Sequence, residues 1–207
     1  MASSTTRLPS NDTAAPSRRV RRKISTRWLI PLAALIAPLL VHADPFPTAD
    51  ALEAQVFKDV RVTLQAPTGW SQQSRVDGDT QAFFVSRDAV TEDGPFQSGI
   101  SLNVVTFPAH VPQESLNYAK SFAITYPNTF GEGAECGWKN GTPLTLFWCQ
   151  ANIDADDHAT TALHHLIANT ETGKLYIFMF ETLREDWQQS WPTISTMLKS
   201  IVVDPAY

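Results

Sequence analysis

Cys136 and Cys149 are the only cysteines in the sequence, and they carry its most reactive side chains. An even number of cysteines favours a disulfide in a protein that reaches an oxidising compartment. Closing a loop this short would stabilise the fold by about 3 kcal/mol, because the bond restricts the unfolded chain. Two separate buried thiols are the alternative. We predict the disulfide.

A cysteine nucleophile needs a base close to its thiol, and the candidates for Cys136 are His164 and His165. The sequence contains no recognisable nucleophile motif and nothing that brings these residues together. The two histidines are neighbours, so on a strand they would point to opposite faces and could not chelate one ion together. We therefore predict no catalytic residue, no enzymatic activity and no cofactor.

Four potential metal ligands fall within five consecutive residues. Carboxylate oxygens in such a segment could hold Ca²⁺, but the glycine and the distant glutamate of an EF-hand loop are missing. We therefore favour a solvated acidic loop over a metal site. The candidate ligands are Asp154, Asp156, Asp157 and His158.

Tryptophans are numerous for a chain of this size, and they could line a ligand groove. Packing in the core, with each indole N–H hydrogen-bonded, is the alternative. Trp138 and Trp148 flank a predicted hairpin tip at Lys139-Asn140-Gly141. We therefore expect these two side chains to be exposed and take them as the candidates for ligand binding.

The charge of the chain is divided unevenly along its length. Residues 1–43 hold seven of the 16 basic residues but only one of the 21 acidic residues. Residues 44–207 are left with nine basic and 20 acidic residues, a formal net charge of −11. Because a surface this acidic repels nucleic acid and anionic lipid, we expect no nucleic-acid partner and no membrane contact except through the leader.

An apolar run of 14 residues from Trp28 to Val41 follows the basic stretch. As a helix it would span about 21 Å, less than the roughly 30 Å of a bilayer core. Val41 and Ala43 place small residues three and one positions before a cut at Asp44. We predict a disordered basic leader and signal peptide over residues 1–43, cleaved near Ala43, and a mature protein that is periplasmic or secreted.

Two alternatives concern this leader. Arg18 and Arg19 are similar to a twin-arginine export signal, but Arg21 and Arg22 stand where that signal has apolar residues. The departure favours general secretion. A signal segment that is retained as an anchor is the second alternative.

Strand and helix patterns follow one another in residues 44–207. Period-two alternation and turn residues predict strands over 60–65, 80–86, 98–107, 131–138, 142–153, 160–170 and 174–182. Helical spacing predicts a short helix over 49–56, a helix over 113–126 that Pro127 stops, and a helix over 187–201 with Pro192 as an alternative start.

The strand over 174–182 is apolar on both faces, so we expect it to be central and covered on both sides. Adjacent hairpins make the sheet mainly antiparallel. The order of strands, helix, four strands and helix predicts one α+β domain over residues 44–207. Its architecture would be an α/β/α sandwich with helices on both faces of the sheet.

Three segments resemble the PsbP-like superfamily: the strand end Pro67–Trp70, the strand Tyr176–Phe180 and the helix Trp191–Ile201. This superfamily includes the extrinsic photosystem II subunit, the Ran-binding nuclear import factor and exported bacterial DcrB-type proteins. The resemblance covers about residues 56–203 and rests on packing features. It implies an accessory or binding role without a shared catalytic site, and it implies no photosystem role.

We therefore predict an exported, non-enzymatic accessory or protein-binding module, whose partner is another envelope or extracellular protein. The alternative is a periplasmic module that binds a small ligand or a metal through the 154–158 loop or an aromatic groove.

Overall fold

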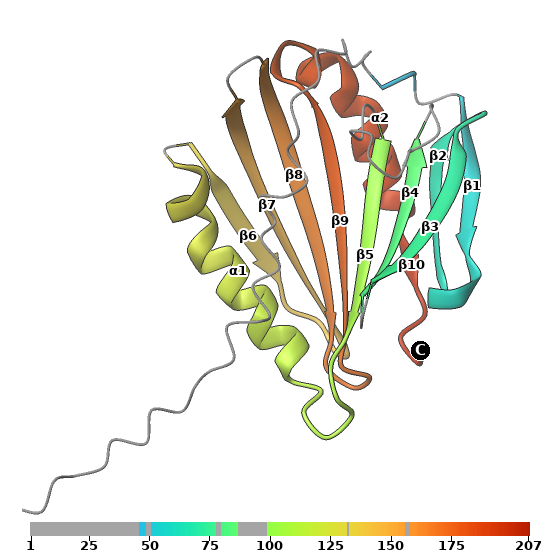
Figure 1. Cartoon of the computed structure of the whole chain (residues 1–207), viewed down its shortest axis with the longest axis vertical. Coiled ribbons are helices and arrows are strands. Elements are labelled where there is room, and N and C mark those ends of the chain that lie inside the picture. Colours follow the sequence, from blue (N-terminus) through green and yellow to red (C-terminus); the bar gives the residue numbers. More distant parts are fainter. Residues whose placement is uncertain (1–45, 49–50, 78–79, 87–98, 132, 156–157) are drawn as a thin grey trace, which may run out of the picture. The chain divides into compact units, whose positions relative to one another are not determined.

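Seven strands form the larger of two sheets in the computed structural model (Figure 1). The model describes residues 46–48, 51–77, 80–86, 99–131, 133–155 and 158–207, which all belong to one compact unit, residues 36–207. The predicted signal peptide over residues 1–43 lies outside this described part. In spatial order the strands are β3 (Ser71–Asp77), β4 (Thr80–Ser86), β5 (Gly99–Thr106), β9 (Lys174–Leu183), β8 (His158–Asn169), β7 (Leu144–Ala155) and β6 (Glu135–Lys139).

Every neighbouring pair of strands in the larger sheet is antiparallel. β9 is the central strand, as its apolar residues on both faces predicted, and β3 and β6 are the two end strands. The mainly antiparallel α+β class is therefore confirmed.

A second, three-stranded sheet has the order β1 (Leu52–Phe57), β2 (Val62–Pro67) and β10 (Val202–Val203), again antiparallel. The prediction of a short helix over residues 49–56 is wrong, because Leu52–Phe57 is a strand. The whole of β1 pairs with β2, from Leu52 opposite Pro67 to Phe57 opposite Val62. Pairing with a strand later in the chain decides the conformation here, and the local pattern does not reveal it.

The two predicted longer helices are α1 (Glu114–Phe130) and α2 (Trp187–Ser200). Pro127 does not end α1, which was predicted to stop before it; the helix continues to Phe130, whose ring lies 4.4 Å from that of Tyr126. α2 starts at Trp187 and not at Pro192, and a 3₁₀ turn at Arg184–Asp186 precedes it. In the described part of the chain, no helix combines enough length and apolar character to span a bilayer.

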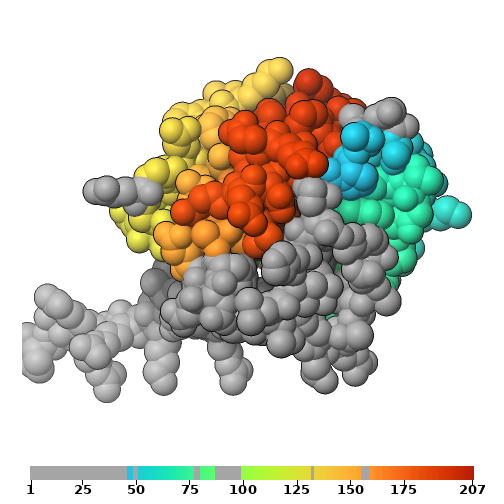
Figure 2. Space-filling model, turned by 90° about the horizontal axis from the view of Figure 1, so that it is seen from above, coloured from blue at the N-terminus to red at the C-terminus, as the bar shows by residue number. Residues whose placement is uncertain are grey.

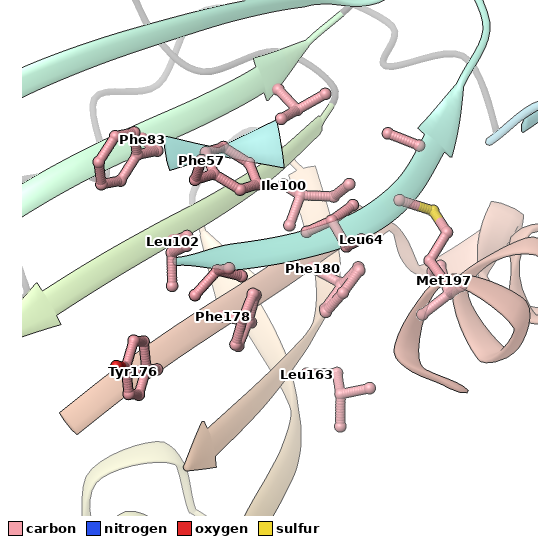
Figure 3. Packing of buried hydrophobic residues seen from close by; sticks show 14 of the residues in the cluster. Phe57, Leu64, Phe83, Ile100, Leu102, Leu163, Tyr176, Phe178, Phe180 and Met197 are labelled. Carbon is pink, nitrogen blue, oxygen red and sulfur yellow. The ribbon is translucent and has the colours of Figure 1, made fainter. Parts of the chain in front are cut away.

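The two faces of β9 belong to different apolar clusters, one formed with its even-numbered and one with its odd-numbered residues. Tyr176, Phe178 and Phe180 belong to the α2 core, which also contains Ile194 and Met197 of α2 (Figure 3). β1, β2, β4 and β5 complete this core with Phe57, Val62, Leu64, Phe83, Ile100 and Leu102. On the face seen in Figure 2, the orange-red to red residues that include α2 lie next to the cyan and green residues of the N-terminal strands.

Leu175 of β9 belongs instead to the α1 core, together with Ala119 of α1, Phe147 of β7 and Leu166 of β8. α1 packs against β6, β7 and β8 and less closely against β9. Met179, which lies on the same face of β9 as Leu175, is only half-buried. Complete covering of both faces of the sheet by helices therefore stays a prediction.

The first described residues, immediately after the predicted cleavage site, are attached to α2. The N–H of Phe46 donates a buried hydrogen bond of 3.0 Å to Ser190 Oγ, and the Thr193 hydroxyl donates to the carbonyl of Pro47. The ring of Phe46 is buried and lies 5.4 Å from the ring of Trp70. Phe46, three residues after Ala43, is therefore packed against α2.

Candidate functional site

The candidate site is the β6 edge, which consists of β6 (Glu135–Lys139) and of Trp148 on the neighbouring strand. β6 is an end strand of the larger sheet, and β7 is its only strand neighbour among the described residues. Cys136 lies directly opposite Cys149, and the two sulfurs are bonded to each other. The predicted disulfide is thus present, and the alternative of two separate thiols is wrong.

The disulfide also identifies which backbone groups of β6 point away from β7. The Cα atoms of Cys136 and Cys149 are 4.1 Å apart. In antiparallel sheets, residues of a non-hydrogen-bonded pair lie about 4.5 Å apart and those of a hydrogen-bonded pair about 5.5 Å apart. Cys136 therefore belongs to a non-hydrogen-bonded pair. By alternation, the N–H and C=O of Cys136 and Trp138 point outward, and those of Gly137 point toward β7.

Trp138 and Trp148 are both exposed, as the sequence predicted, with 64% and 39% of their surface accessible. They do not lie on the same face of the sheet. Trp138 pairs with Phe147, whereas Trp148 pairs with Gly137. Because side chains alternate between the two faces of a strand, the two indoles lie on opposite faces and cannot line a single groove.

The indole of Trp148 lies directly over Gly137. A Cβ atom placed on Gly137 would come within 2.7 Å of three atoms of this ring. On its other side Trp148 pairs with His165 of β8, which in turn pairs with Phe178 of β9. Glycine at position 137 therefore allows an aromatic row to extend across β8 and β7 onto the end strand.

The opposite face beneath the disulfide contains a buried tyrosine–histidine pair that the sequence did not predict. Tyr126 of α1 and His164 of β8 share a hydrogen bond of 3.1 Å between the tyrosine hydroxyl and Nδ1. Burial lowers the pKa of His164 to about 4, so its ring is neutral at neutral pH. Burial, and secondly the charge of Glu181, raise the pKa of Tyr126.

This arrangement does not provide the cysteine nucleophile considered from the sequence. His164 is opposite Cys149, and Cys136 is bonded to Cys149 and has no thiolate. His165 points to the other face of β8, beside Trp148. The buried pair instead packs against Phe122 and Phe130, which lie 5.4 and 6.3 Å from the ring of His164.

The structure describes only part of the candidate metal loop. Asp154 is exposed and forms an ion pair of 2.7 Å with Arg184. Asp156, Asp157 and the side chain of His158 lie outside the described residues. Within the described residues, no group of three or more His, Cys, Asp or Glu side chains is arranged to hold a metal ion.

No protein-family model matches the sequence, and no curated protein matches it either. Several solved structures are similar in fold. Cyanobacterial PsbP (CyanoP) from Synechocystis has a TM-score of 0.49 and 16% identity, with 80% of this chain and 99% of that chain covered.

The Ran-binding protein Mog1p from Saccharomyces cerevisiae has a TM-score of 0.44 and 12% identity, with 73% of this chain and 95% of that chain covered. LpqN from Mycobacterium tuberculosis, described as involved in cell envelope biogenesis, has a TM-score of 0.43 and 9% identity, with 74% and 91% covered. A PsbP protein and a Ran-binding protein, two kinds of protein that the sequence analysis named, are thus among the solved structures with a similar fold. The likeness is one of backbone arrangement alone.

We expect Gly137→Ala to be destabilising because of the Trp148 ring and not because of the strand itself. The new methyl group must displace the indole from its position over residue 137. In the Trp148→Ala background the same substitution meets no ring, and alanine is normally better than glycine in a strand. Urea unfolding of the wild type, the two single variants and the double variant forms a double-mutant cycle. We expect a coupling energy of at least about 0.5 kcal/mol. Equal effects of Gly137→Ala in both backgrounds would contradict this packing.

Stability should fall as the pH drops from about 6.5 toward 4, because burial lowers the pKa of both His164 and His165 to about 4. An unfolded histidine has a pKa near 6.5, whereas burial lowers that of folded His164 to about 4. Between these values the unfolded chain binds a proton that the native state excludes, so protons favour unfolding. His164 alone contributes about 2 kcal/mol to this loss at pH 5, and its contribution vanishes above the unfolded pKa. Urea unfolding near neutral pH and near pH 5 measures it.

The variant His164→Gln isolates this contribution, because glutamine can accept the Tyr126 hydrogen bond and does not titrate. It should lose only the part that His164 contributes, because burial lowers the pKa of His165 to about 4 as well and that residue still titrates. His110→Gln, at an exposed position, is the matched control and should retain it. If the wild type and His164→Gln show the same pH dependence, the buried neutral histidine is not its source.

Proposed function

We propose that this chain is an exported, non-enzymatic protein-binding module whose binding surface is the β6 edge. The partner is another envelope or extracellular protein, which contributes an extended segment as an additional strand. The observation that carries the proposal is Trp138, a large apolar side chain that is 64% exposed on a strand with outward-pointing backbone groups. End strands of this kind are templates for strand addition, in which backbone hydrogen bonds supply affinity and side-chain contacts supply specificity.

Export is supported by two features of the described chain. The Cys136–Cys149 disulfide is of the kind that persists in oxidising compartments such as the periplasm or the extracellular space. Phe46, close behind the predicted cut at Ala43, is buried against α2. Cleavage there would release a mature chain that keeps Phe46 and its contacts with α2.

The rigidity of the β6 edge supports a binding role. The disulfide joins β6 to β7, and the Trp148 ring packs over Gly137 of β6. A strand that is ordered before its partner arrives loses less conformational entropy on binding. The only reactive thiols of the chain are used in this bond, which leaves them a structural role and no catalytic one.

Site-specific photocrosslinking in the native cell tests this function. Trp138 is replaced by photoreactive p-benzoylphenylalanine, and Ile124 is replaced in a matched control. Ile124 is 73% exposed but lies on the helix α1 and offers no strand backbone for pairing. We expect irradiation to join the position-138 variant to a different exported protein, which mass spectrometry identifies, and to give no such product at position 124. The same products at both positions, or none with another protein at position 138, would refute the proposal.

A further inference from the structure

The outward side of β6 is complementary to itself. Glu135 and Lys139 are exposed, lie on the same face of β6 and are four positions apart in the sequence, with Gly137 midway between them. Neither forms an ion pair within the described part of the chain. If two β6 strands meet antiparallel about a two-fold axis at Gly137, Glu135 of each copy lies opposite Lys139 of the other.

We infer that two copies of this chain pair through β6 and join their larger sheets into one continuous sheet. The inference rests on the proposed function only because both place the binding surface at the β6 edge. When no other partner protein is present, a second copy of this chain occupies that edge. The pairing is isologous, as a two-fold axis requires. Opposite charges that face each other across antiparallel strands stabilise the pair, and like charges destabilise it.

The backbone fits the same register. Cys136 and Trp138 are the residues whose N–H and C=O groups point away from β7. With the axis at Gly137, Cys136 of one copy faces Trp138 of the other, and such a pair exchanges two hydrogen bonds. The two-fold axis repeats the pair, so every outward group of these two residues finds a partner. A register centred on Cys136 or on Trp138 leaves one of them without a partner inside the strand and separates Glu135 from Lys139.

The aromatic side chains also gain contacts. On one face, each Trp138 would lie beside the half-buried Cys136 of the opposite copy, and the two Trp138 rings would be diagonal neighbours within reach of each other. On the other face, the two Trp148 rings, each over its own Gly137, would meet near the axis. In the opposite end strand, β3, a two-fold axis at the middle residue, Ser74, places Arg75 opposite Gln73 and brings no opposite charges together.

Charge reversal at exposed positions tests the pairing without disturbing the core. We measure sedimentation velocity of the mature chain, residues 44–207 with the disulfide intact, over a range of concentrations. We expect a reversible monomer–dimer equilibrium. Glu135→Lys alone, and Lys139→Glu alone, place like charges opposite each other and should each weaken the dimer by at least about tenfold.

Two combinations restore opposite charges. The double variant Glu135→Lys/Lys139→Glu should dimerise like the wild type. An equimolar mixture of the two single variants should form a heterodimer, although each variant alone does not dimerise well. Trp138→Ser should weaken the dimer, and Ile124→Ser, at the exposed control position on α1, should not.

The inference is overturned if the wild type is monomeric at every concentration, or if the single charge reversals dimerise as well as the wild type. It is also overturned if the mixture gives no heterodimer. A monomer that still crosslinks to another protein at position 138 removes the self-pairing and leaves the proposed function standing. A dimer that crosslinks at position 138 only to a second copy of this chain supports the self-pairing and refutes the proposed binding of another protein.

Discussion

The Cys136–Cys149 disulfide determines the register of β6 against β7, and every feature of the β6 edge depends on that register. A shift of one residue would move Trp138 to the face of Trp148 and place a side chain where Gly137 now accommodates the indole. It would also turn the backbone groups of Gly137 outward in place of those of Cys136 and Trp138. The covalent bond makes such a shift impossible while it is intact.

The same bond connects the end strand to the interior of the protein. Cys149 is fully buried in a cluster with Tyr126, and on its other side it pairs with His164. An end strand of five residues has little apolar surface of its own and would fray without such an attachment. The disulfide, the buried tyrosine–histidine pair and the Trp148 ring hold the two faces of the β6 edge in place.

Sequence patterns predicted most of the sheet, because strands such as β9 reveal both their conformation and their burial through apolar residues on both faces. The disulfide and the exposure of Trp138 and Trp148 followed from cysteine count and from the hairpin tip between them. The opposite orientation of the two tryptophans could not be predicted, since it depends on the β6–β7 register. The Tyr126–His164 contact joins residues 38 positions apart and has no local signature. Pro127 was wrongly expected to end α1, where packing of Phe130 on Tyr126 supports a further turn.

Amide hydrogen exchange along β6, followed by NMR at increasing protein concentration, tests the central claim most directly. In the dilute monomer we expect the Gly137 and Lys139 amides to be protected by β7, and the Cys136 and Trp138 amides to exchange rapidly. At high concentration the latter two should become protected as well. Protection of Cys136 and Trp138 in the monomer, or rapid exchange of both at every concentration, would contradict the account.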